Sequence, residues 1–431
     1  MTKFEGKFTY FPVGQGLFYF GKITFNNNSF KFIYDCGTES PSNVLVQCIE
    51  SNEINEQDID LLIISHFHCD HISGIKLLIS KVKSIKTVIM PYLSPIERLI
   101  LAAKYLVSGE TTNNLAFSNP ASYLLDIAKG KISNIIYLIK GEDNISVIAE
   151  TSKPIDTSND NLLKFNWQPI EAFTKDFLKE YINGLPENCD IKLDSQLFFS
   201  AYYEFVFYVN PISTYYLNKF ESKLLKDNID TINLHDTICN NFEKLQETYK
   251  NTFTSNLNFT TLVCYHGIMT NHDDNFAHLL LGDIQFKKGN YSNFIRHYEN
   301  RKEKVKITLI PHHGSSYVNI TELLNDFQRS FIWVCCYGIG NRHHHPSENV
   351  INEILLNDKG VILLNQFSPA PIITCFIYDF KNERYIWSIN DPSFNEAITA
   401  LSIPQNRLPL MVNTKCNIST NIVKSRFTYN W

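Results

Sequence analysis

Several features that would set the class of a protein at once are missing or sparse in this sequence. Its ten cysteines are scattered over 431 residues, and only Cys335 and Cys336 are neighbours, inside an apolar, strand-like run. We therefore expect reduced thiols and no disulfide scaffold. No stretch reaches the roughly 20 apolar residues of a membrane helix, and the first residues contain no apolar signal core. These absences predict a soluble, cytoplasmic protein that does not bind membranes.

Charge of one sign is not in excess either, because the formal net charge is -5 at pH 7. Contact with nucleic acid would have to come from local basic patches and not from the field of the whole chain. Hydrophobic residues make up 44% of the sequence. This is enough for a large core in two domains or in one enlarged domain.

What the sequence does contain is a dense group of metal-ligand side chains at the end of an apolar run. Residues 61–64 are typical of a buried strand, and His66, His68, Asp70 and His71 follow at once. The two imidazoles at 66 and 68 can hold one ion, and Asp70 with His71 can hold a second beside it. A histidine-rich surface turn is the plainer alternative.

This string, followed by Ile72-Ser73-Gly74, resembles the signature of the metallo-β-lactamase superfamily. The resemblance implies an α/β fold, specifically an αββα metallo-β-lactamase sandwich, and the length of the chain adds a large, partly helical insertion. It also implies that later strand ends complete the metal site.

Two later strand ends supply candidates for that role. Asp283 follows the apolar run 279–281, and the resemblance implies that it bridges both ions, although Gly-Asp after such a run is most often only a turn. His312 and His313 follow a predicted strand at 307–310. One of them should complete the ion held by Asp70 and His71, with His313 slightly preferred, and the other should face a phosphate oxygen.

Two further segments belong to the predicted site. Asp35 ends a strand at 29–34, and the resemblance implies that it supports the histidine loop from behind, although an aspartate there can also simply form a turn. The loop 337–346 combines glycines, Arg342 and three consecutive histidines ending in His345. Taken alone, that loop could be an adventitious metal binder.

The order of the motifs resembles that of the soluble hydrolase domain of the competence-protein ComEC family. The motifs are residues 13–16, 35–37, 258–261, 281–283, 311–315 and 340–346. The likeness covers about residues 7–90 and 197–390. It predicts a discontinuous core of residues 1–95 and 197–390 with inserted helices at about 214–255, an insertion at 96–196, and a C-terminal tail at 391–431 without a motif.

The sequence departs from the ComEC pattern at the first ion. The ComEC domain commonly has an aspartate where this chain has His68, and a third histidine for that ion has no clear equivalent. His266, His272 and His278 are nearby alternatives outside any matching motif.

The resemblance implies a metal-dependent hydrolase of phosphodiester bonds, most simply a nuclease, in which hydroxide between two divalent ions is the nucleophile. Zinc suits the histidine-rich ligands and manganese is allowed. Asp70 would also orient the nucleophile, His345 would contact the phosphate or protonate the leaving oxygen, and Arg342 would neutralise a nonbridging oxygen. The predicted metal ligands are His66, His68, Asp70, His71, Asp283 and His313 (or His312).

Other functions stay open from the sequence. The substrate could be a small phosphodiester, such as a nucleotide or choline ester, with the insertion as a lid. The histidine string alone permits hydrolysis of a lactone, thioester or β-lactam. A partner-binding module with a structural metal site is a further alternative, in which the insertion recognises a protein. The oligomeric state is not readable.

Away from the site, the pattern predicts helices at 95–107, 214–226 and 235–250. The aromatic residues at 202–208 could stack nucleic-acid bases or could form core on one face, and core is the preferred reading.

Overall fold

The computed structural model describes most of the chain and supports an account of both sheets and the predicted site. The described residues are 3–25, 28–108, 114–139, 189–193, 196–199, 203–210, 212–231, 233–253, 260–269, 276–286, 290–379, 384–390, 398–402 and 410–412. Predictions for Asn258, His272 and most of 391–431 fall outside them.

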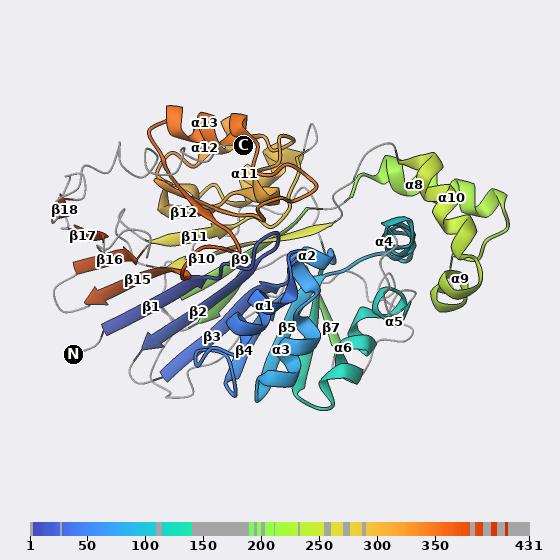
Figure 1. The fold of residues 1–431 in the computed structure, drawn as a ribbon, viewed down its shortest axis with the longest axis horizontal. Coiled ribbons are helices and arrows are strands. Elements are labelled where there is room, and N and C mark those ends of the chain that lie inside the picture. Colours follow the sequence, from blue (N-terminus) through green and yellow to red (C-terminus); the bar gives the residue numbers. More distant parts are fainter. Residues whose placement is uncertain are drawn as a thin grey trace.

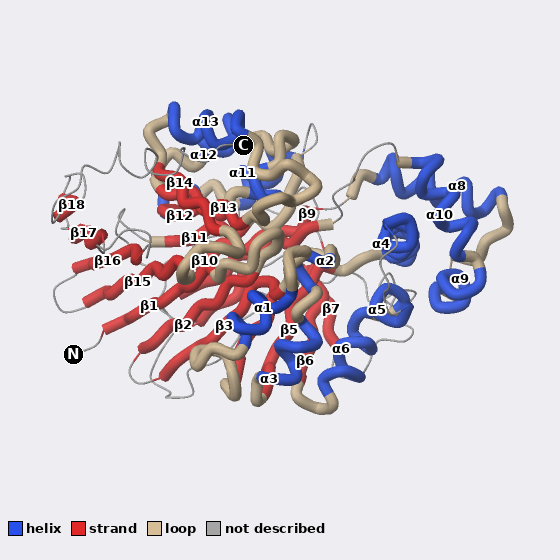
Figure 2. Tube along the Cα trace, in the orientation of Figure 1, coloured by secondary structure: helices blue, strands red, loops and turns tan. Residues whose placement is uncertain are grey.

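Two β-sheets lie face to face at the centre of the molecule (Figure 1, Figure 2). Among the described residues the first has eleven strands in the order β18-β17-β16-β15-β1-β2-β3-β4-β5-β6-β7. These strands are β1 (Lys3–Tyr10), β2 (Phe18–Phe25), β3 (Asn28–Cys36), β4 (Asp58–Ile63), β5 (Ser84–Pro91), β6 (Ile132–Ile139), β7 (Cys189–Leu193), β15 (Ile372–Asp379), β16 (Arg384–Asn390), β17 (Ile398–Ser402) and β18 (Leu410–Val412).

The second sheet has seven described strands in the order β14-β13-β12-β11-β10-β9-β8. They are β8 (Gln196–Phe199), β9 (Tyr203–Asn210), β10 (Thr261–Ile268), β11 (Ala277–Leu280), β12 (Val305–Leu309), β13 (Ile332–Cys336) and β14 (Gly360–Leu364). In both sheets the strands that precede predicted ligands run parallel, namely β3 to β6 in the first and β11 to β14 in the second.

Helices cover the outer faces of both sheets (Figure 1). On the first sheet these are α1 (Ser42–Ile49), α3 (Ile75–Lys81) and α6 (Pro120–Ala128), and on the second they are α11 (Asn290–His297), α12 (Ile320–Asp326) and α13 (Glu348–Leu356). The order helix, sheet, sheet, helix confirms the predicted αββα sandwich.

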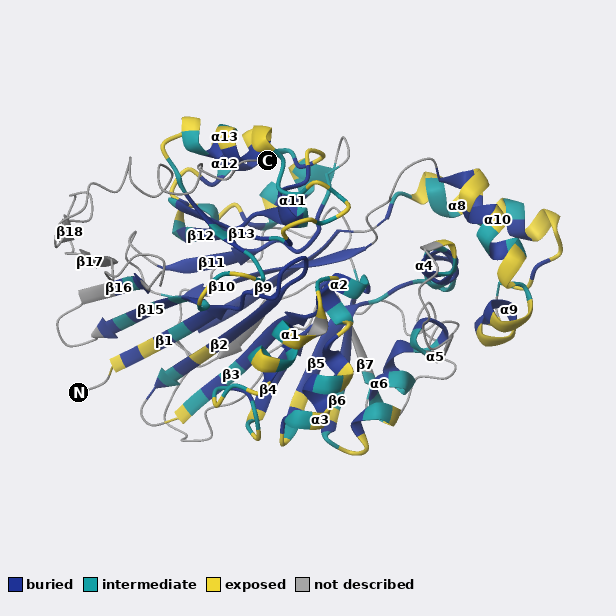
Figure 3. Cartoon of the chain, in the orientation of Figure 1, coloured by how far each residue is buried: buried dark blue, intermediate teal, exposed yellow. Residues whose placement is uncertain are grey.

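Strand β4 shows why residues 61–64, shortly before the histidine string, are apolar at every position. Leu61 and Ile63 pack between the two sheets, whereas Leu62 packs under the helices on the outer face. Side chains alternate along a strand, so a strand with both faces covered is apolar throughout. Figure 3 shows the same pattern across the central strands, which are buried.

A helical group lies at one end of the molecule (Figure 1). It contains α4 (Pro95–Ser108), α5 (Asn114–Ser118), α8 (Thr214–Lys226), α9 (Leu234–Asn240) and α10 (Phe242–Thr252), and α4 packs against the other four. Helix α4 begins as its sequence predicts, because Ser94 and Glu97 bond each other's backbone N–H groups in a capping box.

The structure corrects three details of the sequence interpretation. The predicted helix at 235–250 is broken at Asn241 into α9 and α10. Strands β6 and β7 of the first sheet lie inside the range 96–196, together with helices α4 to α6. The aromatic strand β9 is buried on both faces and not one, so its described rings form core and cannot stack bases.

No helix among the described residues is long and apolar enough to cross a membrane.

A buried ion pair gives a test of the second sheet. Arg301 donates from Nε and Nη2 to the two carboxylate oxygens of Glu204 on β9, each at 2.9 Å. Replacing Arg301 by Met leaves a buried carboxylate without its guanidinium, so we expect a loss of about 3–5 kcal/mol of unfolding free energy in urea titrations.

Two further variants make this prediction specific. The double variant Arg301→Met, Glu204→Leu should recover much of the loss, because no buried charge then stays uncompensated. Arg329→Met, at an exposed pair with Glu303, should change stability little. Equal losses in both single variants would contradict the assignment.

Candidate metal centre

The predicted ligands gather where parallel strands of both sheets end. The first sheet supplies Asp35 at the end of β3 and the histidine loop after β4, which continues into the short helix α2 (Cys69–Ile72). The second sheet supplies Asp283 after β11 and the 3-10 turn Pro311–Gly314 after β12. Because the carboxyl ends of parallel strands share one edge, segments far apart in sequence can meet there.

Asp35 holds the histidine loop from behind. Its carboxylate accepts hydrogen bonds from the backbone N–H of Ser65 at 2.7 Å, from Ser65 Oγ at 2.6 Å and from His71 Nδ1 at 2.7 Å. The residue is fully buried and has a positive φ of 58°. Asp35 thus contacts the histidine loop at both Ser65 and His71.

These bonds also fix where two histidines carry their protons. Since Asp35 only accepts, His71 donates from Nδ1 and turns Nε2 toward the site. The Ser65 hydroxyl donates to Asp35 and so accepts from His66 Nδ1 at 2.9 Å. His66 Nε2 is buried and has no hydrogen-bond partner among the described residues. An unpartnered, buried ring nitrogen is what a metal ligand requires.

The loop can lie this close to β3 because residue 37 is glycine. A Cβ on Gly37 would stand 2.4 Å from the carbonyl carbon of His71. No side chain could be accommodated there without moving the backbone that carries His71.

One set of four buried ligand atoms combines both sheets. Asp70, His71, Asp283 and His313 each offer an atom, and these atoms lie within 4.8 Å of one another. His71 Nε2 is 3.1 Å from Asp283 Oδ1, and His313 Nε2 is 3.1 Å from Asp70 Oδ2. Nitrogen and carboxylate oxygen donors in this number suit zinc and similar divalent ions.

His313, and not His312, joins that set. His313 donates from Nδ1 to the carbonyl of Cys336 at 2.7 Å, which leaves the Nε2 lone pair facing Asp70. His312 is oriented differently, because the Gln285 amide nitrogen donates to its Nδ1 at 3.0 Å, so His312 carries its proton on Nε2. That nitrogen is 3.7 Å from Asp283 Oδ2.

A second set consists of His66, His68 and Asp70, again with ligand atoms within 4.8 Å of one another. Asp283 lies beside it, with Oδ2 3.6 Å from His66 Nε2. Asp283 is thus next to both sets, as a bridging carboxylate would be. His68 is half-buried, and its Nε2 lies 2.8 Å from Lys104 Nζ on helix α4.

Two residues that contact this centre, Ser65 and Lys104, were missed from sequence. Ser65 stands between β4 and His66, where a hydroxyl next to the string was an available signal. Lys104 lies in the middle of an amphipathic helix, and nothing in its local sequence distinguishes it.

Two of the three alternative ligands, His266 and His278, lie in the described part of the chain and do not reach the centre. His266 lies deep between the sheets. Its two ring nitrogens form hydrogen bonds with the hydroxyls of Tyr19, at 2.9 Å, and Tyr203, at 2.6 Å. His278 stacks on His266 and bonds Thr374. Both are core residues.

The loop after β13 places His345 against His312, with ring centroids 5.2 Å apart. Asn341 organises this loop by donating to the carbonyls of Gly338 and His345 and accepting from the backbone of His345. Arg342 is exposed and donates to Glu39 at 3.2 Å. The structure thus brings His345 to the centre and places the Arg342 guanidinium on a surface carboxylate.

Opposite charges in the centre stabilise one another. Burial disfavours a charged His71, yet Asp283, Asp70 and Asp35 raise its pKa well above the usual value. Burial likewise opposes ionisation of Asp283, but His71, His312 and His313 hold its pKa well below the usual value. Burial and the adjacent His71 lower the pKa of His66 to about 3. Buried carboxylates of this kind are normally paired or bound to metal.

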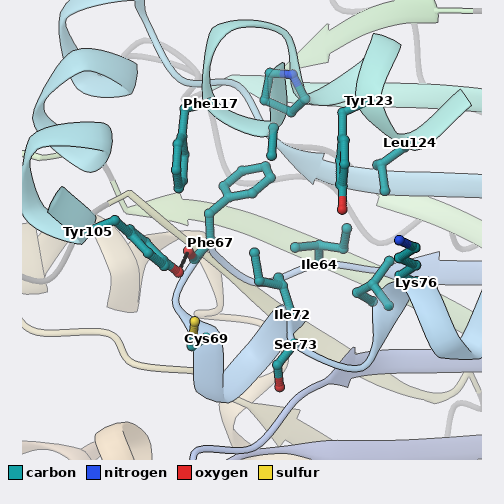
Figure 4. Close-up of a pocket in the computed structure, with 13 residues that line it drawn as sticks. Ile64, Phe67, Cys69, Ile72, Ser73, Lys76, Tyr105, Phe117, Tyr123 and Leu124 are labelled. Atoms are coloured by element: carbon teal, nitrogen blue, oxygen red, sulfur yellow. Dashed lines mark hydrogen bonds between the residues drawn. The ribbon is translucent and has the colours of Figure 1, made fainter. Parts of the chain in front are cut away.

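An apolar cavity of about 270 Å³ lies behind the histidine loop (Figure 4). Phe67 and Cys69 of the loop line it, together with Tyr105, Phe117 and Leu124 of the helices that follow. The side chains of Phe67 and Cys69 point into the cavity, whereas residues 66, 68 and 70 form a ligand set. The loop therefore has an apolar side and a side that carries the predicted ligands.

Comparison with known families agrees with this geometry. Residues 23–102 match the metallo-β-lactamase superfamily model. The matched region includes Asp35 and the whole histidine string. No curated protein sequence matches the chain.

Among solved structures, the chain is similar to MEM-A1, a subclass B3 metallo-β-lactamase isolated from a soil metagenome library. The two chains are 10% identical with a TM-score of 0.27, over 73% of this chain and 82% of the other.

The contacts of Asp35 lead to a direct prediction. Asp35→Asn removes the charge that orients His71 and Ser65, so zinc affinity should fall by about 10- to 100-fold, the usual effect of losing a group that orients metal ligands. Calorimetric titration of the metal-stripped protein measures this.

The matched control is Asp60→Asn, since Asp60 on β4 instead bonds Lys31 and Lys86. It should bind zinc as the parent does. Undiminished affinity in Asp35→Asn, with circular dichroism showing a folded protein, would refute the orienting role.

Proposed function

We propose that this protein is a metal-dependent hydrolase of phosphodiester bonds that uses two divalent ions, zinc or manganese. The observation that carries the proposal is the meeting of two ligand sets, from strands of both sheets, that share Asp70 and lie against Asp283. Motif order resembling the ComEC hydrolase domain supports a phosphodiester as substrate. When bound, such ions activate water and offset negative charge on the reacting phosphate.

The predicted ligands form two groups, one for each ion. His71 and His313 would hold one ion with Asp70, and His66 and His68 would hold the other, with Asp283 between them. Asp70 belongs to both sets, so one of its oxygens can accept a hydrogen bond from the attacking water and orient it. Asp35 keeps the ring nitrogens pointing inward throughout.

His312 and His345 would contact the substrate. His312 carries its proton on Nε2 and can donate it to a phosphate oxygen. Burial and the nearby His312 and His313 lower the pKa of His345 to about 3, so its ring is neutral and acts as a hydrogen-bond donor to phosphate. Arg342 would have to leave Glu39 to neutralise a nonbridging oxygen.

A nucleic-acid strand is the first candidate substrate, by resemblance. A small phosphodiester is the second candidate. The ion pairs that several basic residues form within the protein favour it. Several basic residues that might follow a polynucleotide backbone are bound to carboxylates, which weakens their attraction for a polyanion. These pairs are Lys81–Glu50, Lys83–Asp58, Lys86–Asp60, Arg301–Glu204 and Lys302–Glu299.

The test of the function is a substrate panel with zinc or manganese added. Single-stranded DNA, duplex DNA, RNA, a chromogenic phosphodiester and nitrocefin are compared for the parent and for Asp283→Ala. We expect phosphodiester cleavage that disappears in the variant, because Asp283 belongs to the four-ligand set and lies 3.6 Å from His66 of the other set. Cleavage of polymers identifies a nuclease, and cleavage of the small ester alone identifies the second candidate. Turnover of nitrocefin alone would refute the proposal.

A second variant separates substrate contact from metal binding. His345→Ala should lower phosphodiester turnover by about 10²- to 10⁴-fold, while the zinc content measured by mass spectrometry is unchanged. The control is His344→Asn, because His344 is exposed and asparagine tolerates its positive φ of 55°. Full turnover in His345→Ala would remove His345 from the mechanism.

A further inference from the structure

The apolar cavity behind the histidine loop is large enough to hold a ligand of its own. Its volume is about 270 Å³. An apolar cavity of about 150 Å³ can hold benzene, and such cavities retain water poorly because water needs polar partners. A hydrocarbon group larger than benzene therefore fits this space.

The inner walls of the cavity are apolar. Ile64, Phe117 and Leu124 line it and are buried, and Phe67 of the histidine loop points into the same space (Figure 4). None of the described residues that line the cavity is acidic. A ligand with a negative charge would thus meet no like charge from these residues.

One end of the cavity is polar and reaches solvent. Ser73 and Lys76 line it there and are exposed, and Tyr123 of α6 is half-buried. Figure 4 shows the Tyr123 hydroxyl and the Lys76 ammonium at the same side of the cavity, with Tyr105 at the other. A ligand could therefore place its hydrocarbon part inside and a polar group at Lys76 and Tyr123.

Lys76 and Tyr123 both have hydrogen-bond donors to offer. Lys76 forms no hydrogen bond or ion pair with a described residue, and the same holds for the Tyr123 hydroxyl. Burial raises the pKa of Tyr123, so its phenol keeps the proton. The other hydroxyls at the cavity are already used, because Tyr105 donates to the Phe67 carbonyl and Ser73 to that of Thr38.

The number and charge of these donors favour a carboxylate. A carboxylate only accepts hydrogen bonds and has two oxygens, one for the ammonium and one for the phenol. Its single negative charge also matches the single positive charge of Lys76. A phosphate monoester carries a charge of about −1.5 to −2 at pH 7, which one lysine would not balance.

We propose that the cavity binds a medium-chain fatty acid, with its chain against Phe67, Phe117 and Leu124 and its carboxylate at Lys76 and Tyr123. The chain would lie on the apolar side of the histidine loop, whereas residues 66, 68 and 70 form a ligand set. The site needs neither a metal ion nor a phosphodiester, so it is independent of the function proposed above.

The test titrates fatty acids into the full, metal-stripped chain by calorimetry, so that no carboxylate can bind through a metal ion. Butanoate, hexanoate and octanoate are compared. Each methylene that becomes buried should strengthen binding by roughly fourfold, so octanoate should bind most tightly of the three. Octan-1-ol, which has the same chain without the charge, should bind more weakly than octanoate.

Two variants test the two ends of the ligand. Lys76→Met should weaken octanoate binding by about two- to fivefold, the range of an exposed ion pair, and leave binding of octan-1-ol unchanged. Ala116→Leu adds volume to the cavity wall on α5 and should weaken binding of both compounds by roughly tenfold. The matched control is Lys226→Met, an exposed lysine on α8 outside the cavity, which should bind octanoate like the parent.

Three results would overturn the proposal. They are the absence of octanoate binding, binding that does not strengthen with chain length, and a loss in Lys76→Met that is equal for octanoate and octan-1-ol. Circular dichroism checks that Ala116→Leu folds, and if it does not, the chain-length series and Lys76→Met decide. None of these results alters the outcome of the substrate panel, so the two proposals can fail separately.

Discussion

The burial of three carboxylates in one small space is the condition on which this centre depends. Asp35, Asp70 and Asp283 are each almost fully withdrawn from water. Like charges repel strongly where the dielectric constant is low, and an uncompensated buried charge is costly. The site is stable only if positive charge lies among them, whether on a protonated His71 or on a bound cation. The surrounding histidines are arranged around that requirement.

Each sheet supplies some of the residues that surround the buried carboxylates. The first sheet supplies a rigid ligand loop, pressed against Gly37 and held by the hydrogen bonds of Asp35. The second supplies Asp283 and His313 from successive parallel strands. The orientation of each ring is set by its other nitrogen, through Asp35, Ser65 or the Cys336 carbonyl. Proton positions are thus determined by groups that do not themselves reach the metal-binding side.

Much of this could be predicted from sequence because the signals are local. An apolar run followed at once by ligands, as at His66 or Asp283, predicts both the strand and the edge where it ends. The helices at Pro95 and Thr214 follow from their periodicity. The remainder depends on tertiary contacts. Lys104 is an ordinary helix residue until packing of α4 brings it to His68, and β9 is apolar on both faces only because helices cover its outer side.

The choice between His312 and His313 shows the same limit. Both follow β12, and both have left-handed backbone angles, φ 50° and 51°. What distinguishes them is a carbonyl on the neighbouring strand and an amide on Gln285, and neither contact has a signature in the sequence.

The distance along the chain between ligands has a consequence for how the protein acquires its ions. Asp70 and His313 meet although 243 residues separate them. A growing polypeptide that has passed the histidine loop holds only part of the four-ligand set, and this set cannot close until β12 has emerged and docked. A metal ion held by all four residues would therefore bind at the end of biosynthesis, after the two sheets have joined.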